Sequence, residues 1–387
     1  MKKNILIFLN TYLPGYKSGG PVQAVANLIE ALHEHYNFFV VTRDRDYKDI
    51  QAYSNIEYNI WNKVGNAQVR YLHPKERNLK TYKKIIKDTD FDLLYLQSFW
   101  NPKFSILPLI AFWLSKKNIP ILIHPRGEFF KGALKQKYIK KFFVLLIWKI
   151  FKIYNKVFFN VSSKEEKQYM LDIFTNINKK NLYIAIDFPK KYQLIEYENK
   201  FSRELKLVFI SRIDYKKNLL VLINNIKKLD IDVIFDIYGD ISSRDYWLEC
   251  QESIKNISNK HININYCGVL EHNKIQETLS KYDLFCFFTK GENFGYVIHE
   301  ALSSGLPILI SDKTPWHKMA EYNAGWEIPL DKPELINEKI LEYYNKTDEE
   351  KLAMHKGALQ YATDVSNDKQ ILEDNIKMFD SIMGNSK

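Results

Sequence analysis

The segment DLFCFFTKGENFGYVIHEAL, residues 283–302, contains in order the parts from which one class of fold is built. Residues 284–288 are continuously apolar, as are strands that a parallel sheet buries on both faces. Thr289 to Gly295 supplies loop residues, and from Tyr296 to Leu302 the apolar pattern becomes helical. A buried strand followed by a loop and a helix is the ordinary unit of an α/β protein, so the segment predicts that class.

Two carboxylates in this segment stand where they suit a sugar nucleotide. The start of a helix exposes unpaired backbone N–H groups and the positive end of the helix dipole, where a phosphate would fit. Glu292 falls on the loop and Glu300 on the helix. At about 1.5 Å of rise per residue they can be separated by roughly the length of a nucleoside's sugar, one holding a ribose and one a transferred sugar. The alternative is ordinary α/β anatomy in which both side chains are solvated.

The first half of the chain alternates strand-like and helix-like segments, which predicts a parallel sheet with helices on both faces. A helical pattern covers residues 21–36. The expected strands are residues 4–10, 38–42, 68–72, 93–97, 120–124 and 157–161.

After a polar stretch rich in charge and Tyr, residues 190–204, the same rhythm starts again. The strands expected there are residues 205–211, 233–238, 262–266, 284–288 and 307–311. At 387 residues the chain exceeds what one hydrophobic core usually supports. We therefore expect two doubly wound, mainly parallel, Rossmann-like domains that face one another, with ligand at the carboxyl ends of their strands. The expected boundaries are 1–190 and 205–365 with a linker over 191–204, and a C-terminal helix over 366–387 joins the first domain.

Cysteine usage and the first residues favour a reducing, cytoplasmic setting. Cys250, Cys267 and Cys286 form no CxxC pair and have no His at ligand spacing, which argues against a disulfide framework and a structural zinc. The apolar run that begins at Ile5 is too short for a signal peptide, and we expect it to be the first strand.

The net charge of +10 is concentrated in one segment. Residues 131–156 hold eight Lys and no acidic residue, which leaves a net charge of about +2 for the rest. The apolar run 142–148 lies within the segment, and this cationic, aromatic, amphipathic combination favours contact with an anionic membrane surface. The segment is too short and too charged to span a bilayer. A core helix with a solvated lysine face is the alternative, and nucleic-acid binding is a third.

A basic loop follows the first strand of the second domain. Arg212 and Lys217 can both point at one anion, and fixed cations aimed at a departing diphosphate would stabilise the charge that develops on it. A surface loop with routine lysines is the alternative.

Two segments of the first domain follow strands in the same way. Gly19 and Gly20 precede Pro21, the position where a helix favours proline, and backbone without side chains allows a phosphate or sugar to approach closely. This loop is neither GxGxxG nor a Walker sequence, so a nicotinamide or ATP site has no support there. At the end of another strand, His124 and Arg126 would project into the cleft; a capped strand end is the alternative. The sequence has no Gly-x-Ser-x-Gly elbow and no metal cluster.

Taken together, these segments resemble the retaining glycosyltransferases of family 4, the group 1 type, over nearly the whole chain. The hallmark is a pair of Glu separated by seven residues, here Glu292 and Glu300, accompanied by a basic pair and an N-terminal glycine loop. Residues 124–127 and 133–135, together with 314–316 and 325–326, look like segments of a subgroup that makes bacterial surface polysaccharides.

The resemblance implies two facing domains of the GT-B type and a role for each site residue. Glu300 would bind the donor ribose, Glu292 the donor sugar, and Arg212 with Lys217 would neutralise the leaving group without a metal or other cofactor. His124 would meet the transferred sugar or the acceptor, and anomeric configuration would be retained. The remaining donor-binding residues would be Gly19, Gly20, Asn293, Phe294, Gly295, Tyr296, Gly268 and Val269.

The resemblance also implies partners and a location. They are a nucleotide-sugar donor, a glycan or polyprenyl-diphosphate-linked acceptor for lipopolysaccharide O-antigen or capsule, and the inner face of the cytoplasmic membrane, with no nucleic acid. Two departures stand out: Ser211 replaces a frequent Gly, and residues 184–189 replace the usual Asn-Gly stretch at the domain crossing. A nucleotide-sugar 2-epimerase and a non-catalytic glycan-binding protein of the same fold stay open as alternatives.

Overall fold

A computed structural model describes residues 1–130, 134, 138–161, 163–190, 192 and 202–384. The chain divides into two compact units. Unit 1 comprises residues 1–190 and 368–387, and unit 2 comprises residues 191–367. Most of the stretch expected as a linker, 191 and 193–201, lies outside the described residues.

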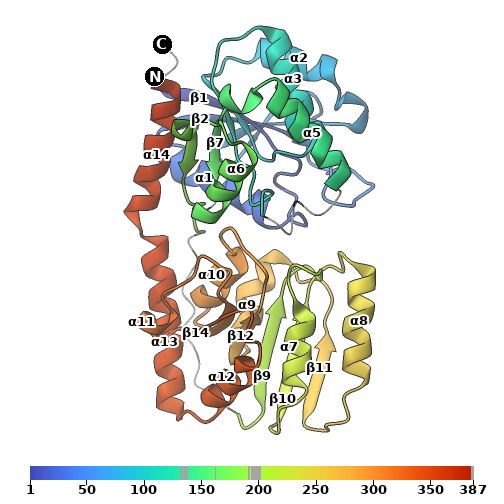
Figure 1. Ribbon diagram of the computed structural model, residues 1–387, viewed down its shortest axis with the longest axis vertical. Coiled ribbons are helices and arrows are strands. Elements are labelled where there is room, and N and C mark those ends of the chain that lie inside the picture. The colour runs from blue at the N-terminus through green and yellow to red at the C-terminus, as the bar shows by residue number, and fades with distance from the viewer. Residues whose placement is uncertain (131–133, 135–137, 162, 191, 193–201, 385–387) are drawn as a thin grey trace. The chain divides into compact units, whose positions relative to one another are not determined.

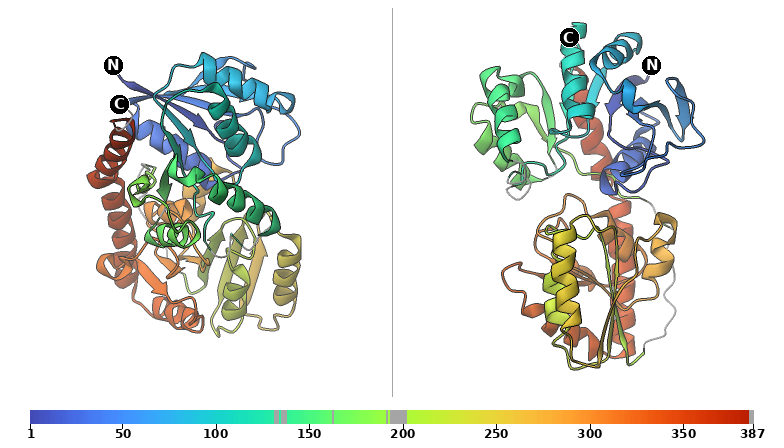
Figure 2. Two further views of the ribbon diagram at one scale, coloured as in Figure 1. Left: turned by 45° about the horizontal axis from the view of Figure 1, so that its top comes forward. Right: turned by 90° about the vertical axis from the view of Figure 1, so that its right-hand side faces the viewer.

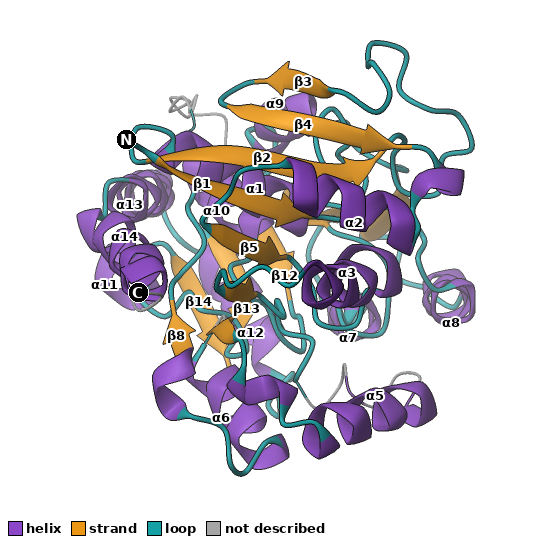
Figure 3. Cartoon of the chain, turned by 90° about the horizontal axis from the view of Figure 1, so that it is seen from above, coloured by secondary structure: helices purple, strands orange, loops and turns teal. Residues whose placement is uncertain are grey.

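Unit 1 is built on an eight-stranded sheet in the order β3-β4-β2-β1-β5-β6-β7-β8, and Figure 3 shows the first five in this sequence. All neighbours pair in parallel except β3 with β4. The strands are β1 Lys3–Phe8, β2 Tyr36–Arg43, β3 Trp61–Val64, β4 Ala67–Leu72, β5 Leu93–Leu96, β6 Ile121–Ile123, β7 Phe158–Val161 and β8 Leu182–Ile184.

Successive side chains of the central strands point to opposite faces of the sheet, and both sets are apolar. Helices therefore cover both faces. In β1, Ile5 and Ile7 belong to one core cluster, whereas Leu6 and Phe8 belong to the other. The second helix of the unit packs on the third, and the first packs on the last, which returns from the C-terminal end of the chain (Figure 1). The helices are α1 Gly20–Leu32, α2 Leu79–Asp88, α3 Leu107–Ser115, α5 Tyr138–Ile150, α6 Lys164–Ile173 and α14 Lys369–Gly384.

Unit 2 is built on a six-stranded, wholly parallel sheet in the order β11-β10-β9-β12-β13-β14. The strands are β9 Leu205–Ile210, β10 Val233–Tyr238, β11 Ile262–Tyr266, β12 Leu284–Phe287, β13 Ile308–Ser311 and β14 Gly325–Ile328. Every residue of β12 and β13 is buried, as expected of central strands that helices cover on both faces.

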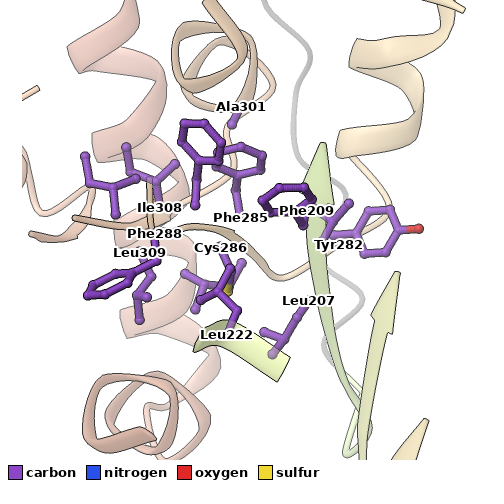
Figure 4. Packing of buried hydrophobic residues seen from close by; sticks show 14 of the residues in the cluster. Leu207, Phe209, Leu222, Tyr282, Phe285, Cys286, Phe288, Ala301, Ile308 and Leu309 are labelled. Atoms are coloured by element: carbon purple, nitrogen blue, oxygen red, sulfur yellow. The ribbon is translucent and has the colours of Figure 1, made fainter. Parts of the chain in front are cut away.

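Helices lie on both faces of this second sheet, and the right-hand view of Figure 2 shows α8 and α9 on opposite sides of it. The helices are α7 Leu219–Ile226, α8 Arg244–Lys255, α9 Ile275–Leu279, α10 Tyr296–Ser303, α11 Met319–Tyr322, α12 Leu335–Tyr344 and α13 Asp348–Ser366. In Figure 4, Leu222 of α7 and Ala301 of α10 approach the buried strand residues Phe285 and Cys286 from opposite sides. One continuous core thus fixes the strand ends of unit 2.

The predicted α/β class and the strands that carry it are confirmed. Three short strands were not predicted from the sequence: β3, β8 and β14. Strand β3 is a partly exposed edge strand of mixed polarity, WNKV, so it carries no buried apolar run. Strand β14 begins at Gly325, and the sequence places no apolar run there either. Within the part of the chain that is described, no helix is both long and apolar enough to cross a membrane.

Candidate functional site

The predicted site residues of unit 2 gather where its chain order reverses. From β9 the chain proceeds to β10 and β11 on one side, whereas β12 leads to β13 and β14 on the other. Ligands of open α/β sheets bind at the carboxyl ends of strands beside such a switch point. The loops that follow β9 and β12, residues 211–218 and 288–295, lie at these ends and carry Arg212, Lys217 and Glu292.

Lys217 and Glu292 form a nearly buried ion pair in this crevice. Lys217 Nζ donates to Glu292 Oε1, and the two side chains are 11% and 13% exposed. Thr289 Oγ1 donates to the same oxygen at 3.2 Å, and Lys217 Nζ stands 5.2 Å from the ring centre of Phe287. Burial acts to raise the pKa of Glu292, but Lys217 and Lys216 outweigh it and hold that pKa below its ordinary value. Glu292 is therefore a carboxylate that can only accept hydrogen bonds.

The loop that carries Lys217 is held by the side chain of Asp214, a residue of the same loop. Asp214 Oδ1 accepts from the N–H groups of Lys216 at 2.9 Å and Lys217 at 3.1 Å, and Asn218 takes a left-handed conformation, φ 59°, before α7. Arg212 is exposed and makes no hydrogen bond or ion pair with a described residue of the chain. One cation of the predicted basic pair is thus held in place, and the other is available to a ligand.

Helix α10 begins at this crevice. Gly295, at φ 78°, caps the helix without a side-chain hydrogen bond, and a Cβ there would come within 2.9 Å of Ile298. Trp316 Nε1 donates to the carbonyl of Phe294 at 2.5 Å, and this bond fixes the loop that precedes α10. Asn293 Oδ1 is buried without a hydrogen bond. The first turn of α10, which includes Tyr296, therefore has the arrangement that favours a bound anion.

Glu300 lies within α10 and is only 4% exposed. Its Oε1 accepts from the Tyr192 hydroxyl at 2.8 Å, and His272 Nδ1 stands 3.6 Å from the same oxygen. Burial and the neighbouring Glu300 raise the pKa of Tyr192. Neither partner was predicted from the sequence, because Tyr192 lies in the charged stretch interpreted as a linker and His272 lies in a turn.

The pair predicted to recognise the base follows β11. The carbonyl of Gly268 accepts from the N–H of Gly239 at 2.8 Å, and Gly268 has a left-handed φ of 78°. Val269 is 60% exposed. The backbone of this turn is fixed, whereas its side chain is open to contact.

In unit 1, Gly19 caps α1 at φ 66° and Gly20 begins the helix. The loop before them is held by Asp46, which is 3% exposed. Asp46 Oδ2 accepts from the N–H groups of Tyr16 at 2.7 Å and Lys17 at 3.0 Å. Asp46 was not predicted from the sequence, because thirty positions separate it from Tyr16.

His124 was expected to project into the cleft, but in unit 1 its side chain is only 1% exposed. Its Nδ1 lies 3.3 Å from the Tyr95 hydroxyl, and burial, together with Arg126, lowers the pKa of His124 well below its ordinary value. The imidazole is therefore neutral at pH 7. Its contact with a substrate stays a prediction.

No group of three or more His, Cys, Asp or Glu side chains among the described residues could hold a metal ion. The structure brings Lys217, Glu292 and the start of α10 together in unit 2, and it places Gly19, Gly20 and His124 in unit 1.

Comparison with known proteins gives a family match over the second unit. Residues 191–360 match the family model of glycosyl transferases group 1. A GtfA subunit of a UDP-N-acetylglucosamine–peptide N-acetylglucosaminyltransferase from Streptococcus agalactiae is 28% identical over 230 residues, which are 55% of this chain and 43% of that protein. An uncharacterized 41.2 kDa protein in the cps region of Klebsiella pneumoniae is 26% identical over 239 residues, 59% of this chain and 62% of that protein. The chain thus spans less than two thirds of either relative.

Solved structures share the fold of both units. HepE of Anabaena in complex with UDP and glucose matches with a TM-score of 0.66 and 13% identity, over 98% of this chain and 100% of that one. Sucrose-phosphate synthase from Thermosynechococcus elongatus matches with a TM-score of 0.70 and 14% identity, over 100% of both chains. TarM of S. aureus matches with a TM-score of 0.67 and 14% identity, over 97% of this chain and 99% of that one. At such identities the match concerns the fold alone.

Proposed function

We propose that this chain, whose residues 191–360 match the family model of glycosyl transferases group 1, is a retaining glycosyltransferase of family 4. It moves a sugar from a nucleoside diphosphate to a glycan or a lipid-linked acceptor. The observation that carries the proposal is the nearly buried Lys217–Glu292 pair at the switch point of unit 2, beside the free start of α10.

Two cationic side chains in this crevice can neutralise the leaving diphosphate. An ammonium group has three donors, and one of those on Lys217 is used by Glu292, so two can reach phosphate oxygens. The Arg212 guanidinium can add a two-pronged contact to the same group. These charges are in place before reaction and stabilise the diphosphate as its bond to the sugar breaks.

The two carboxylates hold the rest of the donor. Ionised Glu292 accepts hydrogen bonds from hydroxyls of the transferred sugar, and Glu300 accepts from the ribose. A carboxylate has about four acceptor positions, so Glu300 can keep its bond from Tyr192 while it binds a ribose hydroxyl. Retention follows when the acceptor attacks on the face that the leaving group vacates.

Because two cations already serve the diphosphate, the reaction proceeds without a divalent metal or another cofactor. Excess EDTA should leave the transfer rate unchanged. A rate that falls to background with EDTA and returns with Mn²⁺ would contradict this mechanism.

The acceptor is a precursor of a bacterial surface polysaccharide, lipopolysaccharide O-antigen or capsule. The relative in a cps region supports this proposal. His124, in unit 1, is proposed to act on the acceptor side.

A peripheral position on the inner face of the cytoplasmic membrane agrees with the surface of α5. Trp148 faces the core at 5% exposure, whereas Phe143 and Ile150 are 58% and 64% exposed. Lys149 and Lys152 are exposed in and just beyond the same helix. The rest of the predicted basic segment, residues 131–133 and 135–137, lies outside the described residues. Flotation with liposomes that contain anionic lipid tests the proposal, and equal recovery with neutral liposomes would contradict it.

The decisive experiment combines binding and turnover. UDP- and GDP-sugars are screened by thermal shift, since a nucleotide that binds the folded state raises the melting temperature. Each donor that binds is then incubated with and without acceptor, and the product's anomeric configuration is read by NMR. An inverted product, or an epimer of the donor formed without acceptor, would overturn the proposal.

A further inference from the structure

Unit 1 has its own switch point, and a cavity opens there. The chain runs from β1 to β2 and β4 on one side, whereas β5 leads to β6, β7 and β8 on the other. The cavity, of about 230 Å³, is lined by residues from the carboxyl ends of β1, β5 and β6 and from the short helix η2, Pro102–Ile106. Open α/β sheets bind ligands at this place. Its volume is below the roughly 300–1,000 Å³ of most small-molecule pockets, which fits a single sugar ring.

Among the described lining residues the cation is Arg126, and it makes four hydrogen bonds with its neighbours. Arg126 Nη1 donates to both carboxylate oxygens of Asp187, at 3.1 and 2.9 Å. Its Nε and Nη2 donate to Gln97 Oε1, at 2.9 and 2.6 Å. Arg126 therefore offers little to an anionic ligand, unlike Arg212 in unit 2.

The lining also contains a carboxyl group that accepts hydrogen bonds from its neighbours. Glu128 Oε1 accepts from Ser98 Oγ at 2.8 Å, and Oε2 accepts from the N–H of Phe99 at 2.6 Å. A phosphate or carboxylate in the cavity would lie beside these acceptor oxygens, and among the described lining residues the cation Arg126 is already bound to Asp187 and Gln97.

Ser105 is a polar residue of the lining that is 3% exposed, and its Oγ has no hydrogen bond with a described residue. Gln97 is 5% exposed, but its Oε1 accepts from Arg126 and its side chain also forms a hydrogen bond with the buried Tyr95 hydroxyl. Ser105 is therefore the stronger candidate for a ligand contact. Buried polar groups are rarely left unpaired, so a hydroxylated ligand would complete the Ser105 hydroxyl.

We infer that this cavity is a subsite for one uncharged, hydroxylated ring of the acceptor, and that Ser105 is its specificity-determining residue. The inference rests on the proposed glycosyltransferase function. The same chemistry could be supplied by the transferred sugar of the donor, so the experiment separates the two sources.

The test uses the full chain and two kinds of ligand. Methyl glycosides of glucose, galactose and N-acetylglucosamine are compared with methyl glucuronide by saturation-transfer NMR, with and without UDP. The neutral glycosides should bind and the glucuronide should not. Ser105→Ala should weaken binding of the neutral glycosides about 5- to 10-fold, as expected for one hydrogen bond. Ser105→Val, which fills the space, should abolish it. Ser115→Ala, at the end of α3 and outside the lining, is the matched control.

Donor affinity and donor hydrolysis without acceptor are measured on the same variants, and neither should change. If Ser105→Val weakens the donor instead, the ring belongs to the donor and the inference fails. The inference also fails if methyl glucuronide binds as well as the neutral glycosides. It fails likewise if Ser105→Val binds the neutral glycosides as tightly as the native chain does, since the cavity would then hold only water. Failure of the proposed function is a different result, because no nucleotide sugar would then bind.

Discussion

The two switch points of this molecule share a topology and differ in charge. In unit 2 the crevice carries Lys217, Glu292 and an exposed Arg212 beside the start of α10. In unit 1 the corresponding crevice carries amides, hydroxyls and the carboxyl group of Glu128, and the cation among its described lining residues, Arg126, is bound by Asp187 and Gln97. The same sheet topology thus occurs twice, and the loop residues decide what chemistry each crevice can perform. In the proposed function the crevice of unit 2, with its exposed cation, binds the donor diphosphate, and the crevice of unit 1 binds the acceptor.

The largest effect is expected where charge acts on the leaving group. Lys217→Ala should lower the transfer rate roughly 100- to 1,000-fold, about 2.7–4 kcal/mol, which is typical of a group that stabilises developing charge. Glu292→Gln should lower the rate to a similar extent, because Glu292 holds both Lys217 and the transferred sugar in place. Steady-state kinetics measures the loss, and circular dichroism confirms that the variants fold. Lys290→Ala, an exposed lysine of the same loop, is the control. Near-native rates in both variants would remove the basis for assigning the donor to unit 2.

The buried ion pair between Arg126 and Asp187 in unit 1 should stabilise the folded state. Asp187→Asn leaves Arg126 without its charged partner, and loss of one member of a buried pair typically costs 3–5 kcal/mol. Because both side chains are 8–9% exposed, we expect about 2 kcal/mol, measured by urea unfolding. Asp49→Asn, in an exposed pair with Lys17, should change stability by less than about 1 kcal/mol. Equal effects would show that the Arg126 pair is not a structural element.

Glu128 of unit 1 and Glu292 of unit 2 should contribute to the stability of the fold with opposite dependence on pH. The pKa of Glu128 is raised to about 7, so its folded form keeps a proton that the unfolded chain loses near pH 4.5, and stability falls as pH rises from about 4.5 to 7. The pKa of Glu292 is lowered, so its contribution is present above the unfolded value and is lost as pH falls through the folded one.

Thermal unfolding from pH 3 to 8 measures both effects. Glu128→Gln should reduce the fall in melting temperature between about pH 4.5 and 7. Glu292→Gln should reduce the fall in melting temperature at acid pH. Identical profiles for the two variants would contradict the difference between the crevices.

The smallest effect on donor binding is expected at Tyr192, whose hydroxyl donates to Glu300. Tyr192→Phe removes one hydrogen bond to a charged group and should weaken donor binding about 5-fold. Isothermal titration with the donor measures it, and Tyr215→Phe, whose hydroxyl contacts Glu249 on the surface, is the control. Tighter donor binding in Tyr192→Phe would mean that the hydroxyl competes with the ribose.

The sequence predicted the fold well because the signals were local. Five-residue apolar runs such as 284–288 can satisfy burial on both faces only as central strands of a covered sheet. The edge strand β3 and the late strand β14 were missed, since neither carries such a run and the sheet supplies their hydrogen bonds. The same reasoning selected Lys217 and Glu292 as candidate site residues because each stands in a loop directly after a strand, and the structure brings the two side chains together.

Other residues could not be found in this way. Asp46 holds the loop at Tyr16 from thirty positions away, and Tyr192 meets Glu300 across more than a hundred. The sequence alone determined the two α/β halves and the residue types at their strand ends, because periodicity and loop composition are local properties. Only the tertiary structure decided which cation is paired and which is free, that His124 is buried, and that Ser105 lines a cavity. Those facts depend on which side chains, distant in sequence, come within hydrogen-bonding distance.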